Sequence, residues 1–106
     1  MAKLSLLAAL ALACVCSAVE FYTDDNYEGI KCIIATPLGE CIKIPDPCYD
    51  QVSSMFFDPE WYCHLFDNDD CSGDEFPVLY NNIAFVGRLF NDRAKSTQCW
   101  LDDRRP

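Results

Sequence analysis

The sequence predicts an all-β protein, a small β-sandwich stabilised by disulfides. Three observations predict this class. Short apolar stretches rich in β-branched and aromatic residues alternate with turn clusters along the chain. Cysteines are frequent, with 8 in 106 residues, and an acidic hairpin sequence occurs twice. None of the apolar stretches in the body of the chain is long enough for an ordinary helix, so helices are expected to be nearly absent.

The first 18 residues resemble a secretory signal peptide. Lys3 supplies a positive charge, Leu4–Val15 is apolar almost throughout, and Cys16-Ser17-Ala18 has small residues where signal peptidase cleaves. We expect cleavage after Ala18, because Glu20 interrupts the apolar run before it could span a membrane. A bacterial lipoprotein acylated at Cys14 is the alternative.

Eight strands are expected in the single domain that follows, residues 19–106. Turn clusters rich in Gly, Pro, Asn and Asp lie between them, and their spacing is typical of antiparallel sheets. The expected strands are Val19–Tyr22, Ile30–Ala35, Cys41–Ile44, Val52–Phe57, Trp61–Phe66, Glu75–Tyr80, Ile83–Val86 and Thr97–Leu101. Since neighbours on a strand face opposite ways, Phe56 and Phe57 cannot both point inward.

An even number of cysteines remains after the predicted cleavage, and in an oxidising compartment they are expected to pair as three disulfides. They are Cys32, Cys41, Cys48, Cys63, Cys71 and Cys99. Six cysteines allow about 15 connectivities, and the sequence does not choose among them. Zinc held by Cys63, His64 and Cys71 is the alternative, disfavoured because export favours disulfides.

Charge and composition exclude some functions. The chain has 17 Asp and Glu against 8 Lys and Arg, a net charge of -9, and its bases form no stripe. Nucleic acid is therefore not an expected partner. The chain has one histidine, His64, which lies beside a cysteine inside an expected strand. No nucleophile and base pattern surrounds it, so we expect no enzyme activity.

Two segments share one frame. Tyr22 to Gly29 and Phe66 to Gly73 each have an aromatic residue, four polar residues, one apolar residue, one further residue and glycine. A second matching pair follows downstream, Asp50 to Ser54 and Asp92 to Ser96. The duplication divides the domain into two halves, motif one at about 19–57 and motif two at about 61–101.

These residues resemble the βγ-crystallins, in particular small secreted microbial and fungal members. The resemblance covers the whole expected domain and implies a sandwich of two Greek-key motifs. It also implies calcium loops, in which two Asn or Asp, two variable residues, Ser or Thr, and Ser provide ligands together with backbone carbonyls of the partner motif's hairpin.

The two calcium loops match this pattern unequally. In the first, Tyr49-Asp50-Gln51-Val52-Ser53-Ser54, an aromatic residue replaces the leading Asn or Asp. In the second, Asn91-Asp92-Arg93-Ala94-Lys95-Ser96, Lys95 replaces the ligand hydroxyl. An ammonium offers no lone pair, so the site at Lys95 is expected to be lost or very weak. Asp50, Ser53 and Asp92 are the metal ligands we expect, for at most one calcium ion. An alternative of equal weight is that both loops are structural turns without metal.

The function we expect is that of a secreted, non-enzymatic, βγ-crystallin-like protein that acts by extracellular contact. It is expected to require no cofactor and to bind at most one calcium ion, weakly. Its partner would be an extracellular protein, a cell wall or a membrane surface. The alternative is a protease inhibitor or an antimicrobial or killer-type toxin on the same fold, and Thr36-Pro37-Leu38-Gly39 or Pro45-Asp46-Pro47 is the inhibitory loop to test. A small glycosidase is a third hypothesis, because carboxylates are abundant.

Overall fold

A computed structural model describes residues 14–103 of the protein, and all regular structure in this range is β. The strands are β1 (Cys16–Asp24), β2 (Glu28–Pro37), β3 (Cys41–Lys43), β4 (Ser54–Phe57), β5 (Trp61–Phe66), β6 (Glu75–Val78), β7 (Asn82–Ile83) and β8 (Ser96–Leu101). Each expected strand is present, which confirms the all-β prediction.

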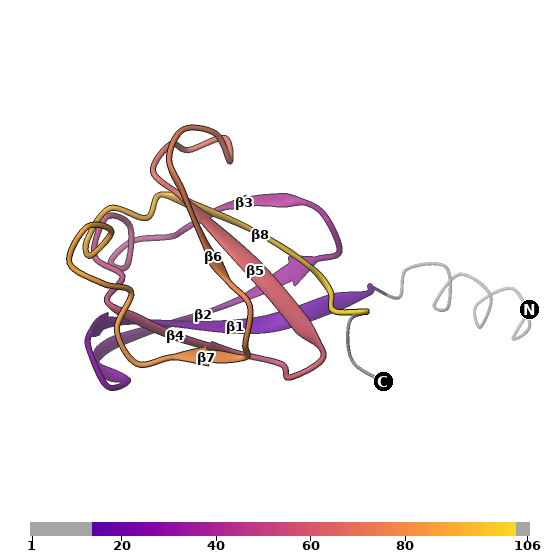
Figure 1. Ribbon diagram of the computed structural model, residues 1–106, viewed down its shortest axis with the longest axis horizontal. Coiled ribbons are helices and arrows are strands. Elements are labelled where there is room, and N and C mark those ends of the chain that lie inside the picture. Colours follow the sequence, from indigo (N-terminus) through magenta and orange to yellow (C-terminus); the bar gives the residue numbers. More distant parts are fainter. Residues whose placement is uncertain (1–13, 104–106) are drawn as a thin grey trace, which may run out of the picture.

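The strands form two antiparallel sheets of four, in the orders β2-β1-β4-β7 and β3-β8-β5-β6. The third strand of each half has crossed to the other sheet. Figure 1 shows β3 running beside β8 and β7 beside β4, at opposite margins of the molecule. Each sheet is therefore completed by the other half, which is the reason the two halves form one sandwich.

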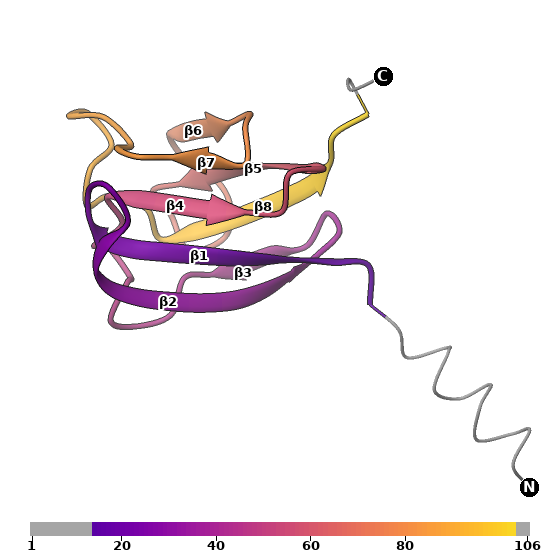
Figure 2. The ribbon, with the colours of Figure 1, turned by 90° about the horizontal axis from the view of Figure 1, so that it is seen from below.

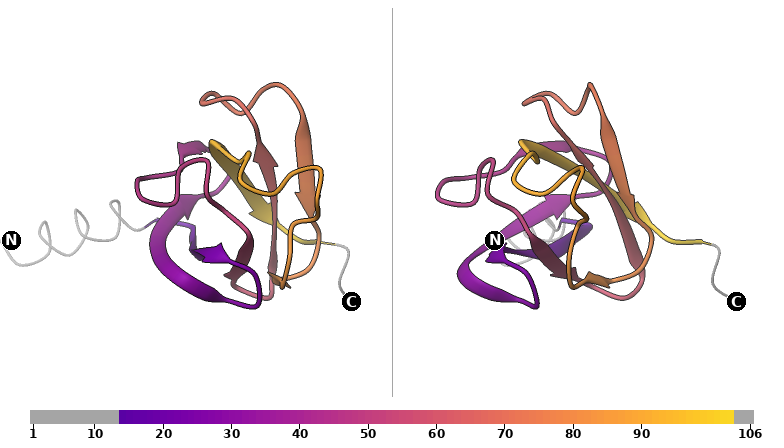
Figure 3. Two further views of the ribbon diagram at one scale, coloured as in Figure 1. Left: turned by 90° about the vertical axis from the view of Figure 1, so that its left-hand side faces the viewer. Right: turned by 60° about the vertical axis from the view of Figure 1, so that its left-hand side comes forward.

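The core lies between the sheets (Figures 2 and 3). Phe21 and Phe57 from the first sheet and Leu65 from the second are almost completely buried. Strand alternation works as predicted at Phe56, whose side chain is 41% exposed while that of Phe57 is 1% exposed. Inward residues of the two sheets thus share one apolar layer.

All eight cysteines lie in the described range, and all are paired. Three disulfides join the six predicted cysteines, as Cys32–Cys48, Cys41–Cys71 and Cys63–Cys99. Cys41–Cys71 links β3 to the turn after β5, so it connects the two halves of the chain. The structure also pairs Cys14 with Cys16. Four disulfides are typical of a protein folded in an oxidising environment.

The beginning of β1 differs from the expectation. The strand starts at Cys16, three residues before the predicted Val19, and Ser17 is completely buried opposite Thr36. The predicted cleavage point after Ala18 therefore falls inside β1. Residues 1–13 of the predicted signal peptide lie outside the described residues, and within the described range no helix is long and apolar enough to cross a membrane.

Four of the expected strands are shorter than predicted, those at Cys41–Ile44, Val52–Phe57, Glu75–Tyr80 and Ile83–Val86. In the first and the last of them, a tertiary hydrogen bond replaces a ladder pair. The stretch expected at Ile83–Val86 leaves the sheet after Ile83, and the N–H of Val86 donates to Ser53 O at 2.9 Å. The stretch expected at Cys41–Ile44 leaves after Lys43, and the N–H of Ile44 donates to Lys95 O at 2.9 Å. Both departures lead to the two loops described next.

Candidate functional site

In each half of the chain, a serine hydroxyl forms the same pair of hydrogen bonds with the hairpin. Ser54 Oγ accepts a hydrogen bond from the N–H of Tyr27 at 3.0 Å and donates to Asp24 O. In the second half, Ser96 Oγ accepts from the N–H of Cys71 at 2.9 Å and donates to Asn68 O. Each serine loop therefore holds the hairpin that precedes it, and the two loops lie in equivalent frameworks.

The residue that follows the aromatic of each hairpin also has an equivalent role. Thr23 Oγ1 accepts from the N–H of Ile30 at 2.8 Å, and Asp67 Oδ1 accepts from the N–H of Asp74 at 2.9 Å. The Arg93 guanidinium donates to Asp67 Oδ2 at 2.7 Å, and this hydrogen bond lowers the pKa of the Asp67 carboxyl. Arg93 thus fixes the second hairpin against the loop that follows it.

In the first loop, three oxygen atoms converge. Ser53 Oγ is 3.0 Å from the carbonyl oxygen of Thr23 and 2.6 Å from Oδ1 of Asn91. Both neighbours are acceptors, while the hydroxyl has one proton and can donate to only one of them at a time. A hydroxyl, a carbonyl and an amide oxygen are ligands that calcium accepts. The residues therefore fit a calcium ion at this place, although three ligands are fewer than the six to eight it prefers.

In the second loop, a lysine lies where the first has the Ser53 hydroxyl. The N–H of Lys95 donates to Phe66 O at 2.8 Å, and the N–H of Ser53 donates to Tyr22 O at 2.9 Å, so the two backbones are equivalent. Lys95 Nζ is 2.8 Å from Oδ1 of Asp50, an otherwise unpartnered, buried atom. The ammonium thus holds the carboxylate oxygen that a bound cation would otherwise need.

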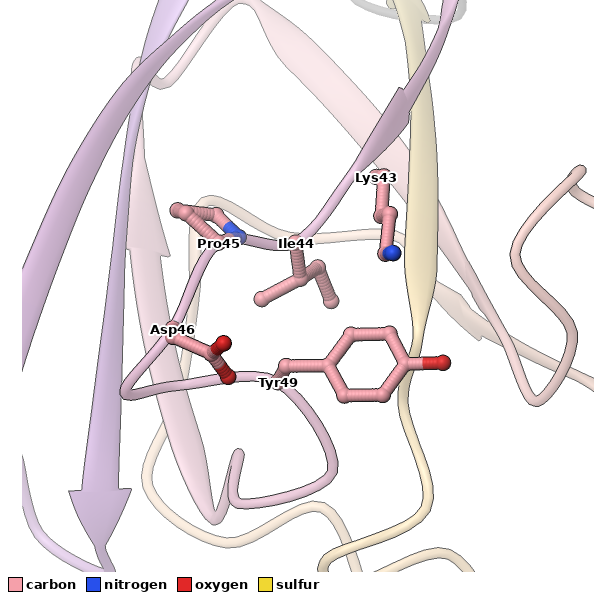
Figure 4. A pocket seen from close by; sticks show the side chains of 5 residues that line it. All are labelled: Lys43, Ile44, Pro45, Asp46 and Tyr49. Atoms are coloured by element: carbon pink, nitrogen blue, oxygen red, sulfur yellow. The ribbon is translucent and has the colours of Figure 1, made fainter.

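Tyr49, the leading residue of the first loop, lies against the lysine of the second loop. Its ring has the ammonium of Lys43 at 5.1 Å and that of Lys95 at 5.9 Å from its centroid, both within the range of cation–π attraction. Figure 4 shows Lys43 and Ile44 above the ring. Together with Pro45 and Asp46, these residues line a hollow of about 360 Å³. The Tyr49 hydroxyl donates to Asp69, and this bond raises the pKa of Tyr49 to about 12.

The three predicted ligands are therefore separated. Ser53 lies among oxygens, whereas Asp50 faces Lys95, and Asp92 is an exposed turn residue with a φ of 61°. The sequence interpretation did not place Thr23 or Asn91 beside Ser53. No spacing signal shows this contact, because Asn91 comes from the other half of the chain. Within residues 14–103, no group of three or more His, Cys, Asp or Glu could hold a metal.

The histidine lies on the outer face of the second sheet. His64 Nδ1 is 2.9 Å from Glu75 Oε2, and its ring contacts the rings of Tyr62, Phe66 and Trp100. Its sequence neighbour Cys63 is in a disulfide with Cys99, and Cys71 is bonded to Cys41. The thiols of the alternative zinc site are thus used in two different disulfides.

Known proteins resemble the chain in structure but not in sequence. No family model and no curated protein matches it. A βγ-crystallin domain from Clostridium beijerinckii has a TM-score of 0.64 and 24% identity over 78% of this chain and 97% of its own. One from Flavobacterium johnsoniae has a TM-score of 0.67 and 16% identity over 82% and 98%. The N-terminal domain of protein S has a TM-score of 0.63 and 19% identity over 79% and 96%.

The chain therefore has a βγ-crystallin-like fold: an all-β sandwich in which two Greek-key halves exchange strands. The expected resemblance is confirmed at the level of the fold. At these identities the neighbours establish the fold alone, so the function must be argued from the two loops.

Proposed function

We propose that the protein is secreted and non-enzymatic, acts by extracellular contact, and binds one calcium ion weakly through its first loop. The observation that carries the calcium proposal is the contrast between the loops. Ser53 Oγ lies within hydrogen-bond distance of two further oxygens, whereas in the second loop Nζ of Lys95 lies against Asp50.

The ligands available at Ser53 predict how strongly the ion would bind. Ser53, Thr23 and Asn91 supply neutral oxygens, so water would have to complete the coordination shell. Sites with few charged ligands bind calcium weakly, in the range of extracellular modules at about 10⁻⁴ to 10⁻³ M. The net charge of -9 raises the local cation concentration without changing the ligand set.

Calorimetric titration of the oxidised protein with calcium tests this proposal. We expect at most one site, lost in Ser53→Ala because the hydroxyl is removed. Lys95→Ala is the matched control, since it changes the equivalent position of the other loop and should leave that site intact. Two equivalent tight sites in the unmodified protein would contradict the proposal.

Support for the extracellular part of the proposal comes from the disulfides and from the predicted signal peptide. A binding screen of the oxidised protein against cell walls, lipid vesicles and proteases, with and without calcium, tests the contact function. Hydrolysis of any substrate in a glycan panel, lost on substitution of a carboxylate, would overturn the non-enzymatic assignment.

One turn favours protease inhibition as the second candidate. Leu38 is 43% exposed at the turn between β2 and β3. Two hydrogen bonds to residues that remain after the predicted cleavage hold the turn: the N–H of Gly39 donates to Cys99 O at 2.8 Å, and Gln98 Nε2 donates to Gly39 O at 2.7 Å. Rigid exposed turns suit inhibitors because little entropy is lost on binding. Stoichiometric inhibition of a protease that Leu38→Asp abolishes would support this function; no inhibition at excess would remove it.

A further inference from the structure

The four edge strands of the two sheets differ in length. Three of them are β7 with 2 residues, β3 with 3 residues, and β6 with 4 residues including Pro77. Short edge strands and prolines are devices that prevent pairing with another chain. The fourth edge is β2, with 10 residues, and Figure 2 shows it along the outer margin of its sheet.

The register identifies the backbone groups that β2 leaves open. The N–H of Leu38 donates to Val15 O at 2.8 Å, and the same register continues from Cys16↔Pro37 to Tyr22↔Lys31. Hydrogen-bonded and non-bonded pairs alternate in antiparallel ladders, so every second residue of β2 faces away from β1. Lys31, Ile33 and Ala35 are these residues, and among the described strands only β1 pairs with β2.

The side chains of β2 do not protect this edge. Ile33 is 61% exposed and Ile30 is 54% exposed. Between Ile30 and Pro37 the strand has one charged residue, Lys31, and no acid, although the chain as a whole has a net charge of -9. Between Ile30 and Pro37 the edge is thus largely apolar, and its one charge is positive in a chain whose net charge is negative.

We propose that β2 is a dimerisation edge, where a second copy of this chain pairs antiparallel about Ile33. In this arrangement Ile33 faces Ile33 of the second copy, and Lys31 faces Ala35, so three residue pairs exchange about six backbone hydrogen bonds. The arrangement is two-fold and closes on itself, which makes a discrete dimer of one continuous sheet.

Charge favours a second copy in this register. The two Lys31 residues would lie four residues apart along the ladder, about 13 Å. That distance exceeds the Debye length of about 8 Å at physiological ionic strength. Each Lys31 also has Glu20 of its own chain at 3.8 Å. No like charges therefore meet across the axis, while the apolar Ile33 side chains do.

The test is sedimentation of the oxidised protein from about 5 μM to about 500 μM, with hydrogen exchange at both ends of the range. We expect a monomer to dimer transition, and slower exchange of the Lys31, Ile33 and Ala35 amides in the dimer. Ile33→Lys places like charges opposite each other and should weaken the dimer at least tenfold. Leu89→Lys, at a side chain that is 87% exposed on a loop, is the matched control and should change it less than twofold.

A monomer at every concentration would overturn the proposal, as would a dimer that survives Ile33→Lys unchanged or protects other amides. Far-ultraviolet circular dichroism of both variants shows whether they fold. If Ile33→Lys does not fold, the exchange pattern of the unmodified protein decides alone. Calcium binding does not involve β2, so the two proposals fail independently.

Discussion

Single hydrogen bonds to carboxylates raise the pKa values of two tyrosines. Tyr22 donates a hydrogen bond to Glu20 and Tyr49 donates one to Asp69. In each case the bond to the carboxylate, supported by desolvation and its negative charge, raises the tyrosine pKa to about 12. Ionisation would break the bond and place two negative charges side by side.

The raised pKa values of these two tyrosines predict how the protein behaves at alkaline pH. An ordinary tyrosine has a pKa near 10, so in the folded protein Tyr22 and Tyr49 keep protons that the unfolded chain has lost. Their stabilising contribution is complete below about pH 10 and disappears as the pH rises through about 12. Absorbance at 295 nm should show a late phase in the ionisation of the 5 tyrosines. Glu20→Gln and Asp69→Asn should each move one tyrosine back towards 10; a single phase near 10 in the native protein would contradict this.

Gly29 and Gly73 are a second case at the residue scale. Both have positive φ, 79° and 85°, and an added Cβ would collide with Thr23 Oγ1 or with Asp67 Oδ1. Gly87 has a φ of 94° but nothing within 4 Å of its Cβ position. We expect Gly87→Ala to cost only the backbone strain, about 1–2 kcal/mol, and Gly29→Ala and Gly73→Ala to cost more. Urea unfolding measures the differences, and three equal losses would contradict this reading.

At the level of elements, the sequence was sufficient to predict the bounds of a strand where buried and exposed side chains alternate strongly. The predicted strand Trp61–Phe66 is β5 without change, because Trp61, Cys63 and Leu65 point inward in turn. It was insufficient at the start of β1, where Ser17 and Ala18 have no strong strand preference and become part of the strand through pairing with β2. The exchange of β3 and β7 between sheets could not be predicted either, since periodicity does not specify which sheet a strand joins.

In the two loops, too, some features could be predicted from the sequence and others could not. The prediction that Lys95 does not act as a ligand needs only its chemistry, since an ammonium has no lone pair. The structure adds that this ammonium lies 2.8 Å from Oδ1 of Asp50. The neighbours of Ser53 were beyond the sequence, because Asn91 is 38 residues away and Thr23 contributes a backbone oxygen that every residue has. Such contacts depend on how the two halves pack.

At the scale of the whole molecule, the disulfides decide which segments stay together. Cys41–Cys71 joins the two halves, and Cys32–Cys48 and Cys63–Cys99 each lie within one. Closing long loops restricts the unfolded chain, typically by about 2–4 kcal/mol for each bridge. We therefore expect Cys41→Ser with Cys71→Ser to lower the unfolding midpoint while the sheets, which need no sulfur, still form.

Removal of the predicted signal peptide would also change the molecule as a whole. Cleavage after Ala18 would leave a chain that begins at Val19 and has three disulfides, without Cys14 and Cys16. It would also remove the first three residues of β1, Cys16 to Ala18, with their partners on β2 left unpaired. Intact mass and peptide mapping of the exported protein should find this N-terminus and three pairings. Free thiols throughout the exported protein would contradict the account.

The two equivalent loops differ at one position, which holds the Ser53 hydroxyl in the first loop and the Lys95 ammonium in the second, and only the first is proposed to accept a cation. Backbone amide chemical shifts, followed by NMR during calcium titration of the oxidised protein, test this proposal most directly. We expect saturable shifts around Thr23, Ser53 and Asn91, with Asp50 and Lys95 unmoved. Equal shifts around Ser53 and around Lys95, or no shift at either, would contradict it.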